Sequence, residues 1–203
     1  MSAPVTQQSP PPEPTPTFRR RLLDGLAASI EERGYRDTTV ADIVRHARTS
    51  KRTFYDHFPS KQECFFELLT ANNEELVDTL RTSIDPAAPW REQVRQAVTA
   101  YVQTIDARPA ITLSWIRELP ALGEAARPMM RQGSGRLAAA IVDLSTGPGF
   151  RRAGLAPLSP TAAVILVGGL REFTAQTVED GLPVTGMIEP AVAVSIALLS
   201  GRG

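Results

Sequence analysis

The sequence has few of the residues from which proteins build metal sites and nucleophilic centres. One of its 203 residues is cysteine and two are histidine. An internal disulfide is therefore excluded, and a structural zinc site has too few ligands. The single cysteine, Cys64, fits a reducing compartment, and we expect a buried, inert thiol there rather than a redox switch. No combination of nucleophile, base and acid is recognisable, so we expect neither an enzyme nor a cofactor.

Long hydrophobic runs are also missing. No stretch approaches the 18 or so consecutive apolar residues that suggest a membrane span, and the N-terminus lacks the basic-then-apolar layout of a signal peptide. We therefore expect a cytoplasmic protein with no membrane partner. No alternating strand pattern and no internal repeat is visible. Hydrophobic residues nevertheless make up 42% of the chain, enough for a sizeable core, and the predicted fold class is all-α.

The net charge is zero, but the charges are unevenly distributed. Residues 18–63 carry ten basic and seven acidic side chains, an excess of three positive charges that the rest of the chain balances. A basic segment joined to an acidic body is typical of a modular DNA-binding protein.

Proline and the capping residues mark the predicted elements. Residues 1–17 hold six of the 17 prolines and little that can be buried, which predicts a disordered arm. A helix begins near Phe18, and Gly34 ends it. Thr39, next to Thr38, and Ser50 are predicted N-caps of two short helices. Ser60 opens a capping box and a long helix that runs to about residue 81.

The remainder of the chain is also predicted to be helical. Apolar stripes predict a helix around residues 94–105, a short helix over 111–119, and longer helices over about 124–144, 160–181 and 186–199. A loop is predicted over 147–157, and Pro160 stands at the first position of its helix, where proline is preferred. The prediction is therefore about nine helices.

Three helices in about 40 residues, with the second and third short and joined by a tight turn, describe a helix-turn-helix. The motifs that narrow this are Gly34-Tyr35, then Thr38-Thr39-Val40-Ala41-Asp42-Ile43, then Ser50-Lys51-Arg52-Thr53-Phe54-Tyr55-Asp56-His57-Phe58, then Ser60-Lys61. In this order and spacing they resemble the DNA-binding signature of the TetR family of transcriptional regulators, over about residues 18–66. Two positions depart from it. Arg48 stands where the family usually has glycine and must adopt an awkward backbone geometry, and Phe54 replaces a more frequent leucine.

The resemblance implies a bacterial regulator with three regions: the arm at 1–17, a helix-turn-helix domain at 18–64, and a helical ligand-binding and dimerisation domain at 65–203. Its partners would be double-stranded operator DNA, a second copy of the chain and an unknown small-molecule effector. The mechanism implied is repression by a homodimer on a palindromic operator, which leaves when effector binds. The long helix that starts at Lys61 is expected to transmit the change, as the only element bridging both halves.

Candidate DNA contacts follow from position on the recognition helix. Lys51, Arg52 and Thr53 lie at its N-terminal end, which enters the major groove, and their side chains suit base edges or phosphates. By resemblance, Tyr55 and His57 bind phosphates, and Thr39 and Lys61 serve the same backbone. The whole candidate set is Thr39, Ser50, Lys51, Arg52, Thr53, Tyr55, His57 and Lys61. The alternative is that these basic residues form only a solvated helix face.

The resemblance also places a ligand cavity among the C-terminal helices. The candidate lining is Tyr101, Trp115, Met130, Phe173 and Gln176, with Met129, Asn72, Gln103 and Thr104 as further possibilities. Aromatic and methionine side chains at helical spacing are more often core, so that alternative stays open. Such a lining favours a medium-sized, mostly apolar ligand.

The last two helices carry more apolar residues than one core face needs, which indicates a dimer interface. The proposed seam includes Val164 and Val167 on the first of them, and Val192 and Ile196 on the second. Two rival functions remain at this point. One is a helical ligand carrier or enzyme with a vestigial DNA-binding head, and the other is a ligand-independent DNA binder or an activator.

Overall fold

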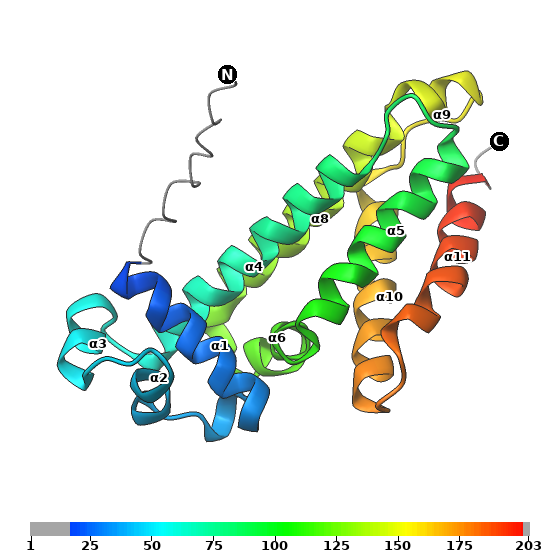
Figure 1. Ribbon diagram of the computed structural model, residues 1–203. Helices are drawn as coiled ribbons and strands as arrows, with labels where there is room; N and C mark the ends of the chain where they lie inside the picture. Colours follow the sequence, from blue (N-terminus) through cyan, green and yellow to red (C-terminus); the bar gives the residue numbers. More distant parts are fainter. Residues whose placement is uncertain (1–16, 201–203) are drawn as a thin grey trace, which may run out of the picture.

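The computed structural model describes residues 17–200 of the chain. All regular elements in this range are helices, without any strand, and the predicted all-α class is confirmed. Three N-terminal helices cluster at one end of the molecule, and the longer helices form an elongated bundle beside them (Figure 1). The arm predicted over residues 1–17 lies outside the described residues except for Thr17, which caps the first helix.

The N-terminal cluster consists of α1 (Phe18–Asp37), α2 (Val40–His46) and α3 (Lys51–His57). The long helices of the bundle are α4 (Lys61–Ser83), α5 (Trp90–Ala107), α8 (Arg127–Ser145), α10 (Pro160–Glu179) and α11 (Ile188–Ser200). Short segments connect them: α6 (Pro109–Leu113), the π-helix η1 (Ser114–Glu118), α7 (Leu119–Ala121), the 3₁₀-helix η2 (Gly123–Ala126), α9 (Pro148–Arg152) and the 3₁₀-helix η3 (Val184–Met187). No helix of the described range is long and apolar enough to cross a membrane.

Capping chemistry sets the helix boundaries of the N-terminal cluster. Thr39, Ser50 and Ser60 each accept a hydrogen bond from the backbone N–H three residues on, which satisfies a donor that the first turn leaves free. Gly34 has φ 78° and interrupts α1 near its end. Arg48 has φ 49° in the turn before α3, so the awkward geometry expected at this position is confirmed.

Two segments differ from the sequence prediction. The loop predicted over 147–157 contains α9, which begins with Pro148 at its first position. The single short helix predicted over 111–119 is divided between α6, η1 and α7. A π-helix needs one extra residue per turn, and no simple apolar spacing reveals that insertion.

The core has two parts, and the first joins the N-terminal cluster to the bundle. Phe54 and Phe58 of the α3 region and Phe65 of α4 are 0–1% exposed. They share one apolar cluster with Ile111 and Trp115, which come from α6 and η1. The second cluster lies between α5, α8, α10 and α11. The domain boundary predicted at residue 64 falls within α4. The first core cluster contains residues from both sides of this boundary, so the division stays a prediction.

Candidate nucleic-acid interface and ligand cavity

Helix α3 is held by one face and presents cations on the other. Phe54 is 0% exposed, and its ring meets the ring of Tyr55 edge to face with centroids 5.3 Å apart. Lys51 and Arg52 are exposed at the start of the helix. Within residues 17–200 neither of these two cations has an ion-pair partner. Two free positive charges therefore stand on the end of the helix that sequence reasoning assigned to the major groove.

The hydroxyls predicted to contact DNA are engaged in caps. The Ser50 Oγ accepts from the Thr53 N–H at 3.1 Å and lies 3.0 Å from Thr53 Oγ1. The Thr39 hydroxyl donates to Asp42 Oδ2 at 2.6 Å, and the Thr39 N–H donates to the same oxygen at 3.0 Å. These contacts fix the starts of α2 and α3, whether or not the same hydroxyls also reach a phosphate.

Tyr55 and His57 lie further along α3. The Tyr55 side chain is 58% exposed, and the His57 side chain is partly buried. The His57 carbonyl accepts a hydrogen bond from Arg19 Nη1 at 3.0 Å. Arg19 also pairs with Glu67 of α4 and lies 4.4 Å from the Phe58 ring centroid. Arg19 therefore fastens the end of α3 to α1 and α4, a positioning role that the sequence pattern did not reveal.

Lys61 is committed to the backbone of its own domain. Its Nζ donates to the carbonyl oxygens of Thr38 at 2.7 Å, Tyr35 at 2.9 Å and Arg36 at 3.4 Å. It also lies 4.3 Å from the Tyr35 ring centroid. Burial lowers the pKa of the Lys61 ammonium. With all three ammonium hydrogens used, this side chain closes the C-terminal end of α1, and a contact to DNA stays only a prediction.

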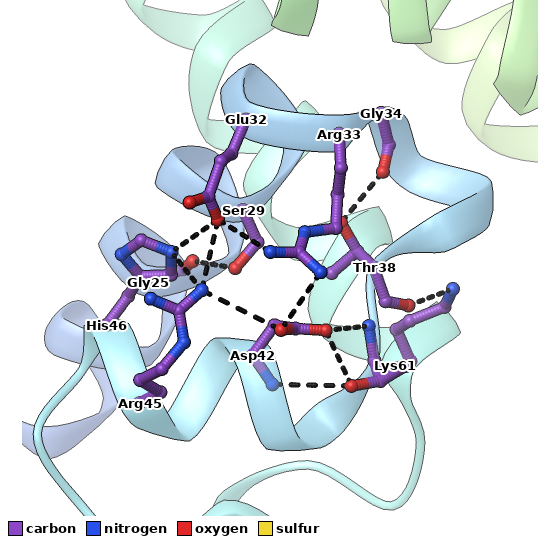
Figure 2. A network of polar contacts seen from close by, with 11 residues as sticks. Gly25, Ser29, Glu32, Arg33, Gly34, Thr38, Asp42, Arg45, His46 and Lys61 are labelled. Carbon is purple, nitrogen blue, oxygen red and sulfur yellow. Dashed lines mark hydrogen bonds and ion pairs between the residues drawn. The ribbon is translucent and has the colours of Figure 1, made fainter.

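An ionic network fixes α2 on α1 (Figure 2). Glu32 of α1 contacts Arg33 at 2.9 Å, Arg45 at 3.0 Å and His46 at 3.2 Å. Asp42 contacts Arg33 at 3.3 Å. The hydrogen bond from Arg33, followed by those from His46 and Arg45, lowers the pKa of Glu32 to about 2. The network orients α2, and through it the turn that aims α3.

The turn itself is held from α1. Arg21 Nη2 donates to the carbonyl of Arg48 at 2.8 Å and also to that of Ala47. The guanidinium thereby satisfies carbonyls at the C-terminal end of α2, where Arg48 adopts its positive φ. Sequence reasoning missed Arg21 because nothing in its neighbourhood along the chain indicates a partner 26 residues away.

A small cavity of about 40 Å³ lies inside the bundle. Its lining comes from α4, α5, α6, η1, α8 and α10: Asn72, Asn73, Leu76, Tyr101, Thr104, Ile105, Thr112, Trp115, Ile116, Gly133, Ser134, Leu137, Val167 and Arg171. Tyr101 and Trp115 were predicted there, together with Asn72 and Thr104. Arg171 and Asn73 were not, because only packing shows that they face one space.

The other three candidate ligand contacts lie elsewhere. Met130 packs on the first core cluster and Phe173 on the second. Gln176 is exposed on α10, and its amide donates to Glu172 at 3.3 Å. None of these three residues lines the cavity.

Two further hollows continue the cavity along the bundle. An apolar one of about 60 Å³ shares Tyr101 and Leu137 with it and extends between α5, α8, α10 and α11. A surface groove of about 300 Å³ shares Leu80 and Leu144 with the apolar hollow and opens near the start of α9. The three hollows form a series from a polar end near η1 to an open end near α9.

The single thiol belongs to neither site. Cys64 is 0% exposed in the core under α1, and burial raises its pKa to about 12. It stays protonated at neutral pH, as expected for an inert core residue.

The N-terminal part of the chain resembles known regulatory proteins in sequence. Residues 22–68 match the family model for bacterial regulatory proteins of the tetR family, and this range contains α2, α3 and the start of α4. The chain is 24% identical to the HTH-type transcriptional regulator YhgD of Bacillus subtilis, over 73% of the chain and 78% of that protein. It is 34% identical to the HTH-type transcriptional repressor KstR2 of Rhodococcus jostii, over 44% of each protein. The N-terminal region of this chain is thus similar to the tetR family of bacterial regulatory proteins.

Solved structures resemble this chain over nearly its whole length. The fatty acid degradation regulator FadR of Bacillus halodurans has a TM-score of 0.78 at 18% identity, over 93% of this chain and 98% of that one. FadR of Bacillus subtilis, solved in complex with stearoyl-CoA, has a TM-score of 0.76 at 15% identity, over 91% and 99%. At such identities the likeness concerns the fold.

The relatives include both repressors and an activator of transcription. DhaR of a Mycobacterium species and KstR2 are transcriptional repressors, whereas FasR of Mycolicibacterium smegmatis is a transcriptional activator. The chain spans 40% to 56% of the lengths of these three proteins. These relatives are thus helix-turn-helix transcriptional regulators, two of them repressors and one an activator.

Proposed function

We propose that this regulator is a repressor that binds double-stranded operator DNA as a homodimer and leaves it when an effector occupies the C-terminal bundle. The observation that carries the DNA half is the pair of unpaired cations, Lys51 and Arg52, on a helix anchored through Phe54. Lysine and arginine at the N-terminal end of a recognition helix suit guanine O6 and N7 in the major groove. The anchoring by Arg19 and Arg21 supports rigid presentation of that helix.

A second copy of the chain is the proposed partner for α10 and α11. Val164, Ile165 and Val194 are 57%, 65% and 62% exposed, and a hypothetical Cβ at Gly168 or Gly169 would meet no atom within 4 Å. Large apolar side chains beside small ones let two helices approach closely. A twofold symmetric dimer would place two copies of α3 about 34–36 Å apart and so favour a palindromic operator.

The proposed seam is narrower than sequence reasoning drew it. Val167 and Val192 are only 2% and 3% exposed, because they belong to the core of their own chain. Ile196 is partly buried against the same core. These three positions were assigned to the dimer interface from periodicity alone, which does not distinguish an intramolecular apolar face from an intermolecular one.

An amphipathic effector is supported by the bundle interior. The series of hollows runs from a polar end to an apolar middle. FadR of Bacillus subtilis, with the same fold, was solved with stearoyl-CoA. We therefore extend the predicted ligand, medium-sized and mostly apolar, to one that also carries a polar head.

The DNA half is tested by selecting bound sequences from random DNA and titrating variants on the winner. Lys51→Ala or Arg52→Ala should each lose about 1–3 kcal/mol of binding free energy and relax the sequence preference at one position per half-site. Arg131→Ala is the matched control, since Arg131 is an exposed arginine on α8, away from α3. Equal losses on all sequences would make these residues phosphate contacts only. An equal loss of DNA affinity in the Arg131→Ala variant would show that α3 is not the specific DNA-binding surface.

A separate measurement distinguishes repression from activation. A reporter promoter carrying the selected sequence should be silenced when this chain is expressed and restored in the Arg52→Ala variant. Increased transcription would assign the chain to activators such as FasR.

A further inference from the structure

One charged side chain lines the polar cavity, and it is not neutralised. Arg171 of α10 donates from Nη1 to Ser134 Oγ at 3.0 Å. Its Nε is shielded from solvent and has no hydrogen-bond partner. No carboxylate of residues 17–200 forms an ion pair with Arg171. Burial lowers the pKa of this guanidinium.

A second orphan polar atom faces the same cavity from another helix. Asn73 of α4 is 9% exposed, and its Oδ1 has no hydrogen-bond partner. Both residues line the same small space. Unpaired polar atoms at buried positions are rare in native proteins, and each needs an explanation. Two in one cavity, a donor on α10 and an acceptor on α4, indicate a group that supplies both partners.

The remaining lining sets the sign and polarity of that group. Apart from Arg171, the residues that line the cavity are uncharged. The Thr174 hydroxyl donates to the Leu170 carbonyl at 2.8 Å, so the Tyr101 hydroxyl must donate to Thr174 Oγ1 at 2.9 Å. The adjoining hollow beyond Tyr101 and Leu137 has no charged residue in its lining. The site is positive at one end and apolar at the other.

The cavity is contracted around Trp115. A Cβ at Gly133 would lie 2.4 Å from the Trp115 ring, so the absence of a side chain on α8 is what admits the indole. The hollows of about 40 and 60 Å³ are well below the volumes of typical ligand sites. A ligand that occupies both hollows must therefore enlarge them, and the Trp115 indole forms part of the wall of the polar one.

We propose that this cavity binds an organic acid with an apolar body, whose carboxylate pairs with Arg171 and whose hydroxyl donates to Asn73. The proposal deepens the effector role put forward above and rests on it. The apolar body enters the hollow beyond Tyr101, and Trp115 moves away from Gly133 as the site fills. A hydroxylated medium-chain acid has all these features.

The probes are octanoate, 3-hydroxyoctanoate, 1-octanol and octanoyl-CoA, titrated into the full chain. Binding is followed by calorimetry and by Trp115 fluorescence in a Trp90→Phe background. Both acids should bind at least tenfold more tightly than the alcohol, and the hydroxy acid should bind most tightly. Arg171→Gln should weaken acid binding about 10- to 100-fold, the size expected for a charge-assisted hydrogen bond, and leave octanol binding unchanged. Asn73→Leu should remove only the advantage of the hydroxy acid.

Controls separate this proposal from the repressor proposal. Arg136→Gln removes an arginine of α8 that pairs with Glu74 at the surface and should not change acid binding. Arg171→Lys keeps the charge but removes Nε, and it should also weaken binding of both acids. All variants are titrated with the selected DNA, which Arg171→Gln should bind like the wild type.

The outcomes that overturn the proposal are specific. Acids that bind no more tightly than octanol, an unaltered Arg171→Gln variant, or binding of the thioester alone would each overturn it while leaving DNA binding intact. Failure of the wild type to bind any DNA would instead overturn the repressor proposal, whatever the acids do.

Discussion

The ammonium of Lys61, which was predicted to contact the DNA backbone, donates to backbone carbonyls of its own domain. Three carbonyl oxygens near the end of α1 receive its hydrogens at 2.7–3.4 Å. We predict that Lys61→Ala lowers the free energy of unfolding by about 1–3 kcal/mol, because buried carbonyls lose their donor. Thermal and denaturant unfolding measure this. Lys51→Ala is the matched control and should leave stability unchanged, since Lys51 is exposed. Normal stability with a flattened salt dependence of DNA binding would return Lys61 to the phosphate contacts.

The Glu32 carboxylate makes a pH prediction. Its pKa falls from 4.5 to about 2 because Arg33, His46 and Arg45 bind the charged form. A carboxylate with a lowered folded pKa contributes stability above about pH 4.5, and this contribution is lost as the pH falls toward 2. The Glu32 side chain is about half exposed to solvent, which keeps the effect small. Glu32→Gln should flatten the change in melting temperature between pH 5 and pH 2. Identical pH profiles for Glu32→Gln and the wild type would contradict this role.

At the scale of elements, η1 connects more parts than its length suggests. Glu118 pairs with Arg36 of α1 at 2.7 Å. Arg117 pairs with Glu172 at 2.9 Å and Glu179 at 2.7 Å, both on α10. Trp115 lines the cavity between these contacts. The expectation that the helix starting at Lys61 alone bridges the two halves was therefore wrong, because α6 and η1 also pack on α1.

This arrangement predicts that DNA binding changes the environment of the Trp115 side chain. Adding the selected DNA to the Trp90→Phe protein should change the Trp115 emission, because α1 and η1 share the Arg36–Glu118 contact. Arg36→Ala should diminish that change while altering stability by no more than about 1 kcal/mol, as expected for an exposed pair. Arg95→Ala, which breaks the similar pair with Glu189 between α5 and α11, is the control. An unaltered response in Arg36→Ala would leave α4 as the route.

The sequence predicted those structural features whose interacting residues lie close together in the chain. The caps at Thr39 and Ser50 and the strained turn at Arg48 were predicted correctly, because their partners lie within a few residues. The π-helix, the free Nε of Arg171 and the anchoring by Arg21 were not, because each depends on distant segments meeting. For the same reason only two of the five ligand candidates, Tyr101 and Trp115, line the cavity.

At the scale of the whole molecule, assembly gives the sharpest prediction. Ile165→Asp should yield a folded monomer, because Ile165 is 65% exposed in the single chain but would be buried against a second copy. Val167→Asp would not test this, since Val167 lies in the core of its own chain. Sedimentation of Ile165→Asp beside Leu182→Asp, at a similarly exposed apolar position just after the end of α10, checks the idea. A dimeric Ile165→Asp protein would place the interface elsewhere.

The shared core beneath α1 limits how this protein can be re-engineered. Ile111, Trp115 and Leu119 complete the apolar cluster around Leu26, Phe54 and Phe65. A DNA-binding head cut out near residue 66 would expose that surface to water and should aggregate or remain partly unfolded. Grafting a different operator preference onto this sensor therefore requires exchanging the outward residues of α3 alone, not swapping the head as a cassette. The same coupling means that heating should melt head and bundle in one transition rather than two.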